Sequence, residues 1–173
     1  MTSSKATPDV RLRAMEPEDL DLLYRIENDS ELWDVGSTSV PYSRYTLHDY
    51  IAESTGDIYT DRQVRLIIEN GQGQTVGIAD IVNFDAKNCR AELGLVIERA
   101  HRRKGYARST ILQMANYALH VLHLHQLYVI IAADNASTVK LFQTMGYKTS
   151  ATLPDWLYDG KSYHDALLMH TFF

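Results

Sequence analysis

A short basic loop between an apolar strand and a long helix is the feature that most restricts this chain. The stretch from Arg90 to Ile97 is mainly apolar, and apolar residues recur at helical spacing from Tyr106 to His123. The segment Arg102–Ala107 between them holds three cations, and the small residues Gly105 and Ala107 would let an anion approach the main chain. The first N–H groups of a helix lack partners and carry positive potential, so cations there destabilise the helix unless an anion binds. The loop therefore predicts a cradle for a pyrophosphate-like anion, with a solvated basic turn as the alternative.

The length, charge and cysteine content of the chain bound its class. Its 173 residues suit one domain, which we place at residues 10–173 after a flexible arm at residues 1–9. The net charge of −5 argues against a general nucleic-acid binder. Cys89 is the single cysteine, which fits a reducing compartment, and no apolar run is long enough for a bilayer or a signal peptide. These features predict a cytoplasmic protein without a membrane partner.

Hydrophobic periodicity predicts an alternation of strands and helices along the whole chain. Strands are expected at 10–13, 64–69, 75–84, 90–97 and 127–132, helices at about 17–26, 45–53, 106–123 and 135–145, and two last strands on either side of Asp159–Gly160. The apolar run at 127–132 is typical of a strand covered on both faces. The order predicts an α/β (α+β) fold in which a mixed, mostly antiparallel, twisted sheet of about seven strands has helices on both faces.

Two blocks of this sequence resemble the GCN5-related N-acetyltransferase (GNAT) family. The segment Arg102–Ala107 is similar to the family signature Q/R-x-x-G-x-G/A, and it lies in the same place, after a strand and at the start of a long helix. The second block is the strand at 127–132, then Asn135, a helix and Met145–Tyr147. The loop is neither a Walker loop nor a G-x-G-x-x-G dinucleotide motif. The resemblance extends from about Val10 to the C-terminus and implies the GNAT fold, with acetyl-CoA as the cofactor.

The resemblance also implies how acetyl-CoA is held. Free backbone groups of a splayed strand would hold the pantetheine arm, the amides of the basic loop would take the pyrophosphate, and the second block would line the thiol end. The amine would bind at the same time and attack the thioester directly. The implied cofactor residues are Leu95, Val96, Ile97, Arg102, Arg103, Lys104, Gly105, Tyr106, Ala107, Asn135, Lys140 and Phe142.

Glu92 and Phe142 are the residues on which the predicted chemistry depends. An ammonium group cannot attack a thioester, so the acceptor must lose a proton to a carboxylate, directly or through water. We predict that Glu92, in an otherwise apolar strand, is this base; the alternative is an exposed Glu paired with Arg90 or Arg99. Many members of the family have, at the position of Phe142, a Tyr that protonates the departing thiolate. Phe142 cannot do this, so water or another hydroxyl such as Tyr147 would have to replace it.

The acceptor is predicted to be a small polyamine such as spermidine. Arg90–Gly94, the segment from Glu27 to Trp33 and the Asp159–Gly160 hairpin are most similar to two branches of the family, the spermidine/spermine (diamine) N-acetyltransferases and the ribosomal-protein alanine N-acetyltransferases. Between residues 21 and 34 five acids stand against the single base Arg25, which favours a polycation. The same acids are also typical of a solvated helix surface. The predicted substrate residues are Glu27, Trp33, Tyr42, Glu92, Leu93 and Gly94.

Two other functions stay open at this point. One is acetylation of a protein N-terminus, of the ribosomal alanine type, and the other is an acyl-CoA-binding domain without turnover, which Phe142 favours. No metal site is expected, because His120, His123 and His125 span a helix end and a strand start, so their side chains should diverge. A homo-oligomer is compatible with the sequence, which does not decide the oligomeric state.

Overall fold

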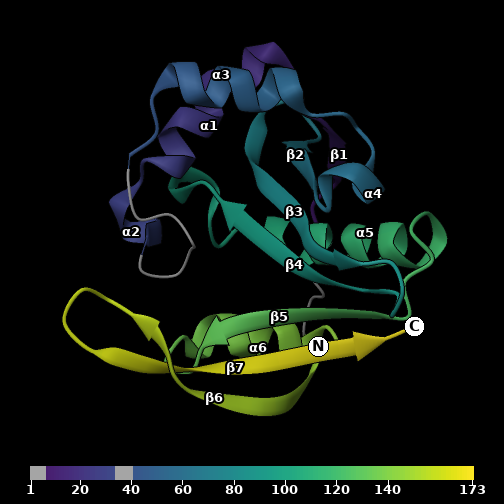
Figure 1. Ribbon diagram of the computed structural model, residues 1–173, viewed down its shortest axis with the longest axis vertical. Coiled ribbons are helices and arrows are strands. Elements are labelled where there is room, and N and C mark those ends of the chain that lie inside the picture. The colour runs from purple at the N-terminus through teal and green to yellow at the C-terminus, as the bar shows by residue number, and fades with distance from the viewer. Residues whose placement is uncertain (1–6, 34–40) are drawn as a thin grey trace, which may run out of the picture.

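One seven-stranded sheet forms the centre of the computed structural model, which describes residues 7–33 and 41–173, the side chains of Glu31 and Trp33 excepted (Figure 1). Its order is β1-β2-β3-β4-β5-β7-β6, and only the β4–β5 pair is parallel. The prediction of a mixed, mostly antiparallel sheet of about seven strands is confirmed. The strands are β1 (Val10–Ala14), β2 (Val64–Asn70), β3 (Thr75–Asp85), β4 (Arg90–Ile97), β5 (Gln126–Ala132), β6 (Lys148–Tyr158) and β7 (Tyr163–Phe172).

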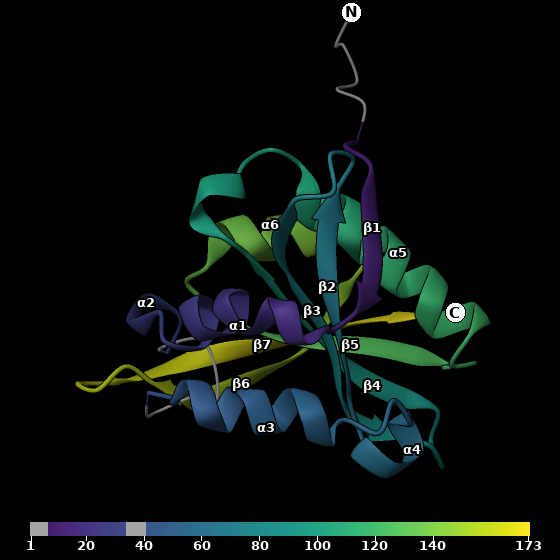
Figure 2. The same cartoon turned by 90° about the horizontal axis from the view of Figure 1, so that it is seen from above.

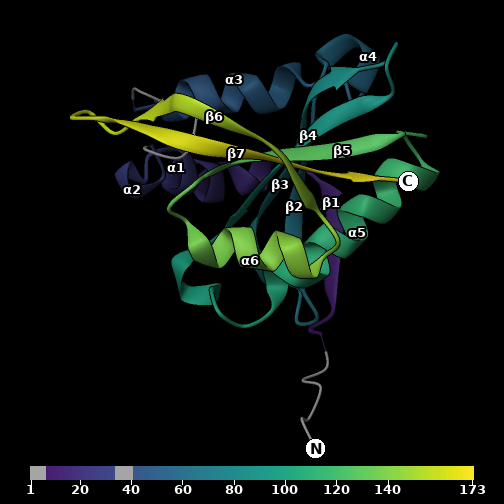
Figure 3. The same cartoon turned by 90° about the horizontal axis from the view of Figure 1, so that it is seen from below.

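Helices cover both faces of the sheet, as the sequence predicts. Helices α1 and α3 lie side by side across one face, and α5 and α6 cover the other (Figures 2 and 3). None of the helices in the described part of the chain is long and apolar enough to span a membrane. The helices are α1 (Leu20–Glu27), α2 (Ser30–Trp33), α3 (Arg44–Glu53), α4 (Ile58–Asp61), α5 (Tyr106–His120) and α6 (Ala136–Thr144), with 3-10 turns η1 (Pro17–Asp19) and η2 (Arg99–His101).

Each face of the sheet has its own apolar core, because strand side chains alternate between the two faces. On the α5/α6 face, Ala91 and Leu93 of β4 pack with residues of α5 and α6. On the α1/α3 face, Ile67 of β2 and Ile78 of β3 pack with residues of α1 and α3. The polar residues that lie between these core positions, such as Glu92, therefore point toward α1 and α3.

Three local features differ from the sequence predictions. Helix α5 ends at His120 instead of His123, because His123 adopts a positive φ of 52°, which ends a right-handed helix. The one-turn helices α2 and α4 were not predicted, since four residues carry too little periodicity to be recognised. Strand β5 is not covered on both faces: Leu127, Val129 and Ile131 are buried, but the residues between them are only half-buried.

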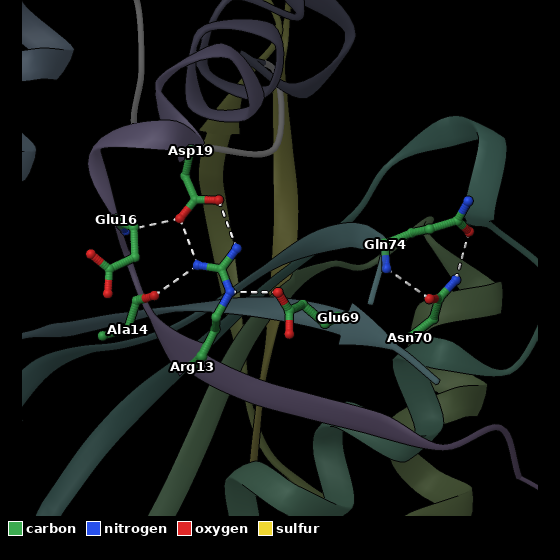
Figure 4. Close-up of polar contacts among 7 residues, drawn as sticks. All are labelled: Arg13, Ala14, Glu16, Asp19, Glu69, Asn70 and Gln74. Atoms are coloured by element: carbon green, nitrogen blue, oxygen red, sulfur yellow. Dashed lines mark hydrogen bonds and ion pairs between the residues drawn. The ribbon is translucent and has the colours of Figure 1, made fainter. Parts of the chain in front are cut away.

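Arg13 of β1 links this strand to β2 and to the turn that follows it (Figure 4). Its guanidinium donates to both carboxylate oxygens of Asp19 at 2.6 and 2.8 Å, and its Nε donates to Glu69 of β2 at 2.6 Å. Asp19 also accepts from the backbone N–H of Glu16 at 2.9 Å. Burial opposes the negative charge of Asp19, but the bonds from Arg13 and Glu16 outweigh it, so the pKa of Asp19 is lowered. This network ties β1, η1 and β2 together and sets where α1 begins.

Candidate active site

The centre of the site is a fork between β4 and β5. The two strands pair only at Arg90–Gln126, Ala91–Leu127 and Glu92–Tyr128. Beyond this point β4 pairs with β3 and β5 pairs with β7, and the two strands diverge (Figure 1). Buried main-chain N–H and C=O groups require partners, so the diverging part of β4 is suited to hydrogen-bond an extended ligand. The predicted pantetheine residues Leu95–Ile97 lie in this part.

The basic loop at the start of α5 is shaped by its own side chains. Arg102 donates from Nε to the carbonyl of Ile97 at 3.0 Å, and the Lys104 ammonium donates to the carbonyl of Ala100 at 2.8 Å. Gly105 is the N-cap of α5, and no side chain caps the first turn. The N–H groups of that turn are therefore available to an anion, and the exposed cations beside them add positive charge.

Gly105 has a structural reason in addition to the expected approach of an anion, which stays a prediction. A Cβ at this position would lie 2.9 Å from Cδ of Pro8, and the residue has a positive φ of 92°. Further along the same side of α5, Ser109 donates from Oγ to the carbonyl of Pro8 at 2.6 Å, and Gln113 donates to the carbonyl of Val10. The absent side chain thus serves the backbone turn and the packing of residues 8–10 on α5. The predicted arm otherwise falls on residues 1–6, which lie outside the described residues.

A hollow of about 210 Å³ lies between α1, the end of β4 and the basic loop. An ion pair of 3.1 Å between Arg25 and Glu98 links α1 to the end of β4 at this point. Three predicted cofactor residues, Val96, Ile97 and Arg102, therefore line the same hollow as residues of α1. The lining includes Arg25, Ile26, Asp29, Val96, Ile97 and Arg102.

The predicted cofactor residues of the second block have other surroundings. Asn135 caps α6, and its Oδ1 accepts from the N–H of Thr138 at 3.2 Å. Lys140 is exposed on α6. Phe142 is 5% exposed and packs edge to face on Tyr147, with ring centroids 4.9 Å apart. Asn135 and Phe142 thus have structural roles of their own, and their contact with the cofactor stays a prediction.

Glu92 lies at the point where β4 and β5 part. Its side chain is half-buried on the α1/α3 face, and its Oε2 accepts from Nδ2 of Asn83 at 2.8 Å. Arg90, one of the partners considered for Glu92, pairs instead with Asp85 at 3.2 Å. Tyr128, the cross-strand neighbour of Glu92, is also half-buried; burial and then the charge of Glu92 raise its pKa.

The predicted substrate residues fall into two groups. Gly94 lies beside Asp80 on the α1/α3 face: a Cβ on Gly94 would be 3.3 Å from the Asp80 Cβ. Glu27 of α1 reaches the same face and pairs with Arg65 of β2. Leu93, by contrast, is 5% exposed and belongs to the core of the α5/α6 face. Strand alternation turns the side chain of Leu93 away from Glu92, so a contact of Leu93 with substrate stays a prediction that its main chain would have to fulfil.

Tyr42 and Trp33 belong to the segment that joins α1 and α3. The main chain of Tyr42 is held by Asn28, whose Oδ1 accepts from its N–H at 2.7 Å and whose Nδ2 donates to its carbonyl at 3.0 Å. The Tyr42 side chain packs on the core of the α1/α3 face. Trp33 ends α2, and the prediction for its side chain lies outside the described residues.

The acidic residues of this region are partly neutralised. Asp21 pairs with Arg44 on the surface, and Glu27 pairs with Arg65. Arg65 also donates to both oxygens of Asp80, at 2.8 and 2.9 Å. Burial opposes the charge of Arg65, but the two carboxylates outweigh it and its pKa is raised.

Sequence reasoning missed Arg65, Asp80, Asn83 and Tyr128 as parts of the site. A signal was present for two of them, since Arg65 and Asp80 are charged residues inside otherwise apolar strands. Charges at such positions have to be paired when buried. Their pairing with each other, however, depends on the register between β2 and β3, which places Arg65 opposite Asp80.

The comparison with known families decides what this arrangement is. The sequence profile described as "Acetyltransferase (GNAT) domain" matches residues 9–148. The chain belongs to the GNAT acetyltransferase family. GNAT enzymes take the acetyl group from acetyl-CoA, and the fork of β4 and β5 and the uncapped start of α5 fit that cofactor. The resemblance inferred from the two sequence blocks is confirmed.

Several relatives match this chain over nearly its whole length. The spermidine N(1)-acetyltransferase of Vibrio cholerae is 24% identical over 92% of this chain and 90% of its own length. The Escherichia coli K12 enzyme of the same name is 23% identical over 94% and 86%. The Bacillus subtilis protein YdaF, provisionally named a ribosomal N-acetyltransferase, is 25% identical over 95% and 92%. The crystal structure of the V. cholerae enzyme with CoA and spermine superposes with a TM-score of 0.84, at 24% identity, over 94% of this chain and 95% of that one.

Proposed function

We propose that this N-acetyltransferase acetylates a primary amine of a small polyamine such as spermidine. The observation that carries the proposal is the charge of the α1/α3 face beside the fork. Glu27, Asp80 and Glu92 contribute three carboxylates there, and Arg65 neutralises only part of that charge. A polycation gains from such a surface. The spermidine acetyltransferases among the relatives support the same substrate class.

The chain's own residues then have the following roles. Bound acetyl-CoA supplies an activated thioester. The first-turn amides of α5 and the cations at 102–104 bind its pyrophosphate, and the main chain of Leu95–Ile97 binds its pantetheine arm. Glu92, at the fork, takes a proton from the acceptor ammonium, directly or through a water, so that the neutral amine can attack the thioester.

Phe142 cannot donate a proton to the departing thiolate, and this has a testable consequence. Burial raises the pKa of Tyr147, whose ring packs on Phe142, which makes its hydroxyl a poor acid. We therefore expect water to protonate the thiolate, and we expect Phe142→Tyr to keep releasing free CoA. Thiol release by the variant, with Tyr147→Phe as the companion variant, measures this. A folded Phe142→Tyr protein without turnover would contradict the placement of Phe142 at the thiol end of acetyl-CoA. Loss of turnover only in Tyr147→Phe would identify Tyr147 as the acid.

An acceptor panel tests the proposed substrate. Purified protein is incubated with acetyl-CoA and spermidine, spermine, short diamines or peptides with a free N-terminus, and free thiol is measured. We expect release with the polyamines and little with the peptides. Release only with peptides would favour the ribosomal alanine type, which the relative YdaF supports. A thermal shift with acetyl-CoA but no release with any acceptor would favour a binding domain without turnover.

Two further properties stay proposals. The single cysteine, Cys89, supports a reducing compartment, and we place the enzyme in the cytoplasm on that ground. A homo-oligomer is compatible with the exposed aromatic residues Trp156, Tyr158 and Tyr163 of the β6–β7 hairpin. Sedimentation of the purified protein would measure its oligomeric state.

A further inference from the structure

Asn83 interrupts β3 at the level of the fork. The regular register between β3 and β4 shifts between Val82 and Asp85, so Asn83 lies in a bulge. It has a positive φ of 51°, a conformation that Asn tolerates better than most residues. A bulge redirects a side chain out of the regular strand pattern, and bulges are common beside active sites.

The Asn83 amide contacts the carboxylate of Glu92 on the neighbouring strand. Its Nδ2 donates to Oε2 of Glu92 on β4 at 2.8 Å. Glu92 and Tyr128 form the last cross-strand pair before β4 and β5 diverge. The amide of Asn83 on β3 thus contacts Glu92 at the point where β4 and β5 separate.

We propose that Asn83 is a positioning residue that orients the carboxylate of Glu92 for proton transfer at the fork. The bond from Asn83 occupies Oε2, and we assign Oε1 to the acceptor amine. A glutamate side chain has several rotatable bonds, and fixing its carboxylate before the substrate binds removes an entropic cost from the reaction. The inference rests on the proposed role of Glu92 as the base.

Other charged groups near Glu92 do not reproduce this arrangement. Asp80 shares the α1/α3 face but is held by both donor groups of Arg65. Arg90, on the same strand as Glu92, pairs with Asp85. Tyr128 of β5 is the titratable residue directly opposite Glu92 in the sheet. Within the described residues, the hydrogen bond from Asn83 is the direct contact that fixes the Glu92 carboxylate.

Two substitutions at position 83 test the proposal without straining the backbone. Asn83→Gly keeps the positive φ and removes the amide, and we expect kcat with polyamine to fall about tenfold or more with an unchanged KM for acetyl-CoA. Asn83→Asp keeps the shape but places a carboxylate against Glu92. Because a second negative charge favours the protonated form of the Glu92 carboxyl, we expect the acidic limb of the pH–rate profile to move to higher pH. Asn116→Asp makes the same chemical change at an exposed position on α5 and serves as the control.

The outcome separates this inference from the role of Glu92 itself. If Glu92→Gln loses activity while both Asn83 variants keep the wild-type kcat and pH profile, the positioning role is wrong and the base stands. If Glu92→Gln retains full activity, the base assignment fails first. If Asn83→Gly lowers the melting temperature as well as kcat, its loss of kcat no longer separates positioning from folding, and the pH–rate profile of Asn83→Asp decides. An unmoved acidic limb in that folded variant would overturn the proposal.

Discussion

Replacing Glu92 by Gln is expected to lower kcat by about 10²–10⁴-fold, the usual contribution of a general base. Gln has nearly the same shape and can still accept the hydrogen bond from Asn83, so the fold and the fork should be retained. The affinity for acetyl-CoA, measured by calorimetry, should not change, because the cofactor is assigned to the main chain of β4 and the start of α5. The loss should therefore be in kcat and not in cofactor binding.

The pH dependence of the Glu92→Gln variant gives a second and independent readout. Without a base, the rate depends on the fraction of acceptor amine that is already neutral in solution. Amines of this class titrate near the value of lysine, about 10.4, so the rate of the variant should rise steadily from pH 7 to 9. Glu53→Gln, at an exposed position on α3, is the matched control and should behave as the wild type. A Glu92→Gln enzyme with the wild-type rate and profile would show that Glu92 is not the base.

Replacing Arg65 by Met is expected to reduce the free energy of unfolding by about 3–5 kcal/mol. Arg65 pairs with Glu27 of α1 and with both oxygens of Asp80 of β3. The three side chains are only 19%, 14% and 16% exposed, respectively. Removing the guanidinium leaves two carboxylates in a partly buried place without their cation, which is more costly than losing the ion pair alone. Urea unfolding followed by circular dichroism measures the change.

Two further variants show whether the effect comes from the uncompensated carboxylates. Arg44→Met breaks the pair with Asp21 on the surface, where water screens both groups, and little change in the midpoint is expected. Adding Glu27→Gln and Asp80→Asn to Arg65→Met should recover much of the lost stability, because no buried charge then remains unpaired. An Arg65→Met midpoint equal to that of the wild type would mean that water already reaches these carboxylates.

The elements that sequence periodicity predicts are those with long, local and regular patterns. The strand at 90–97, the basic loop and the start of α5 at Tyr106 agree with the structure, because an apolar stripe and a helix start depend on neighbouring residues. The predictions failed where the pattern was short or where a single backbone angle decided the outcome. Helix α4 is one turn long, and α5 stops before the positive φ of His123.

The basic loop and the second block were enough to indicate a cofactor site and the GNAT family from sequence. They did not indicate what surrounds Glu92. Asn83 is nine residues before Glu92, Arg65 is 38 residues after Glu27, and Ser109 is 101 residues after Pro8. Period-two alternation tells which residues share a face of a strand, but not which residue of another strand lies opposite.

By itself, then, the sequence determined the strand at 90–97, the basic loop and the start of α5, the cofactor class and Glu92 as a candidate base. Only the tertiary structure decided that Leu93 points into the opposite core, that Glu27 and Asp80 share Arg65, and that β4 and β5 part at Glu92 and Tyr128. The physical reason is that local patterns follow from the bonded geometry of neighbouring residues. The site instead depends on strand register and on the order β3-β4-β5-β7 in the sheet, which are set by packing over the whole chain.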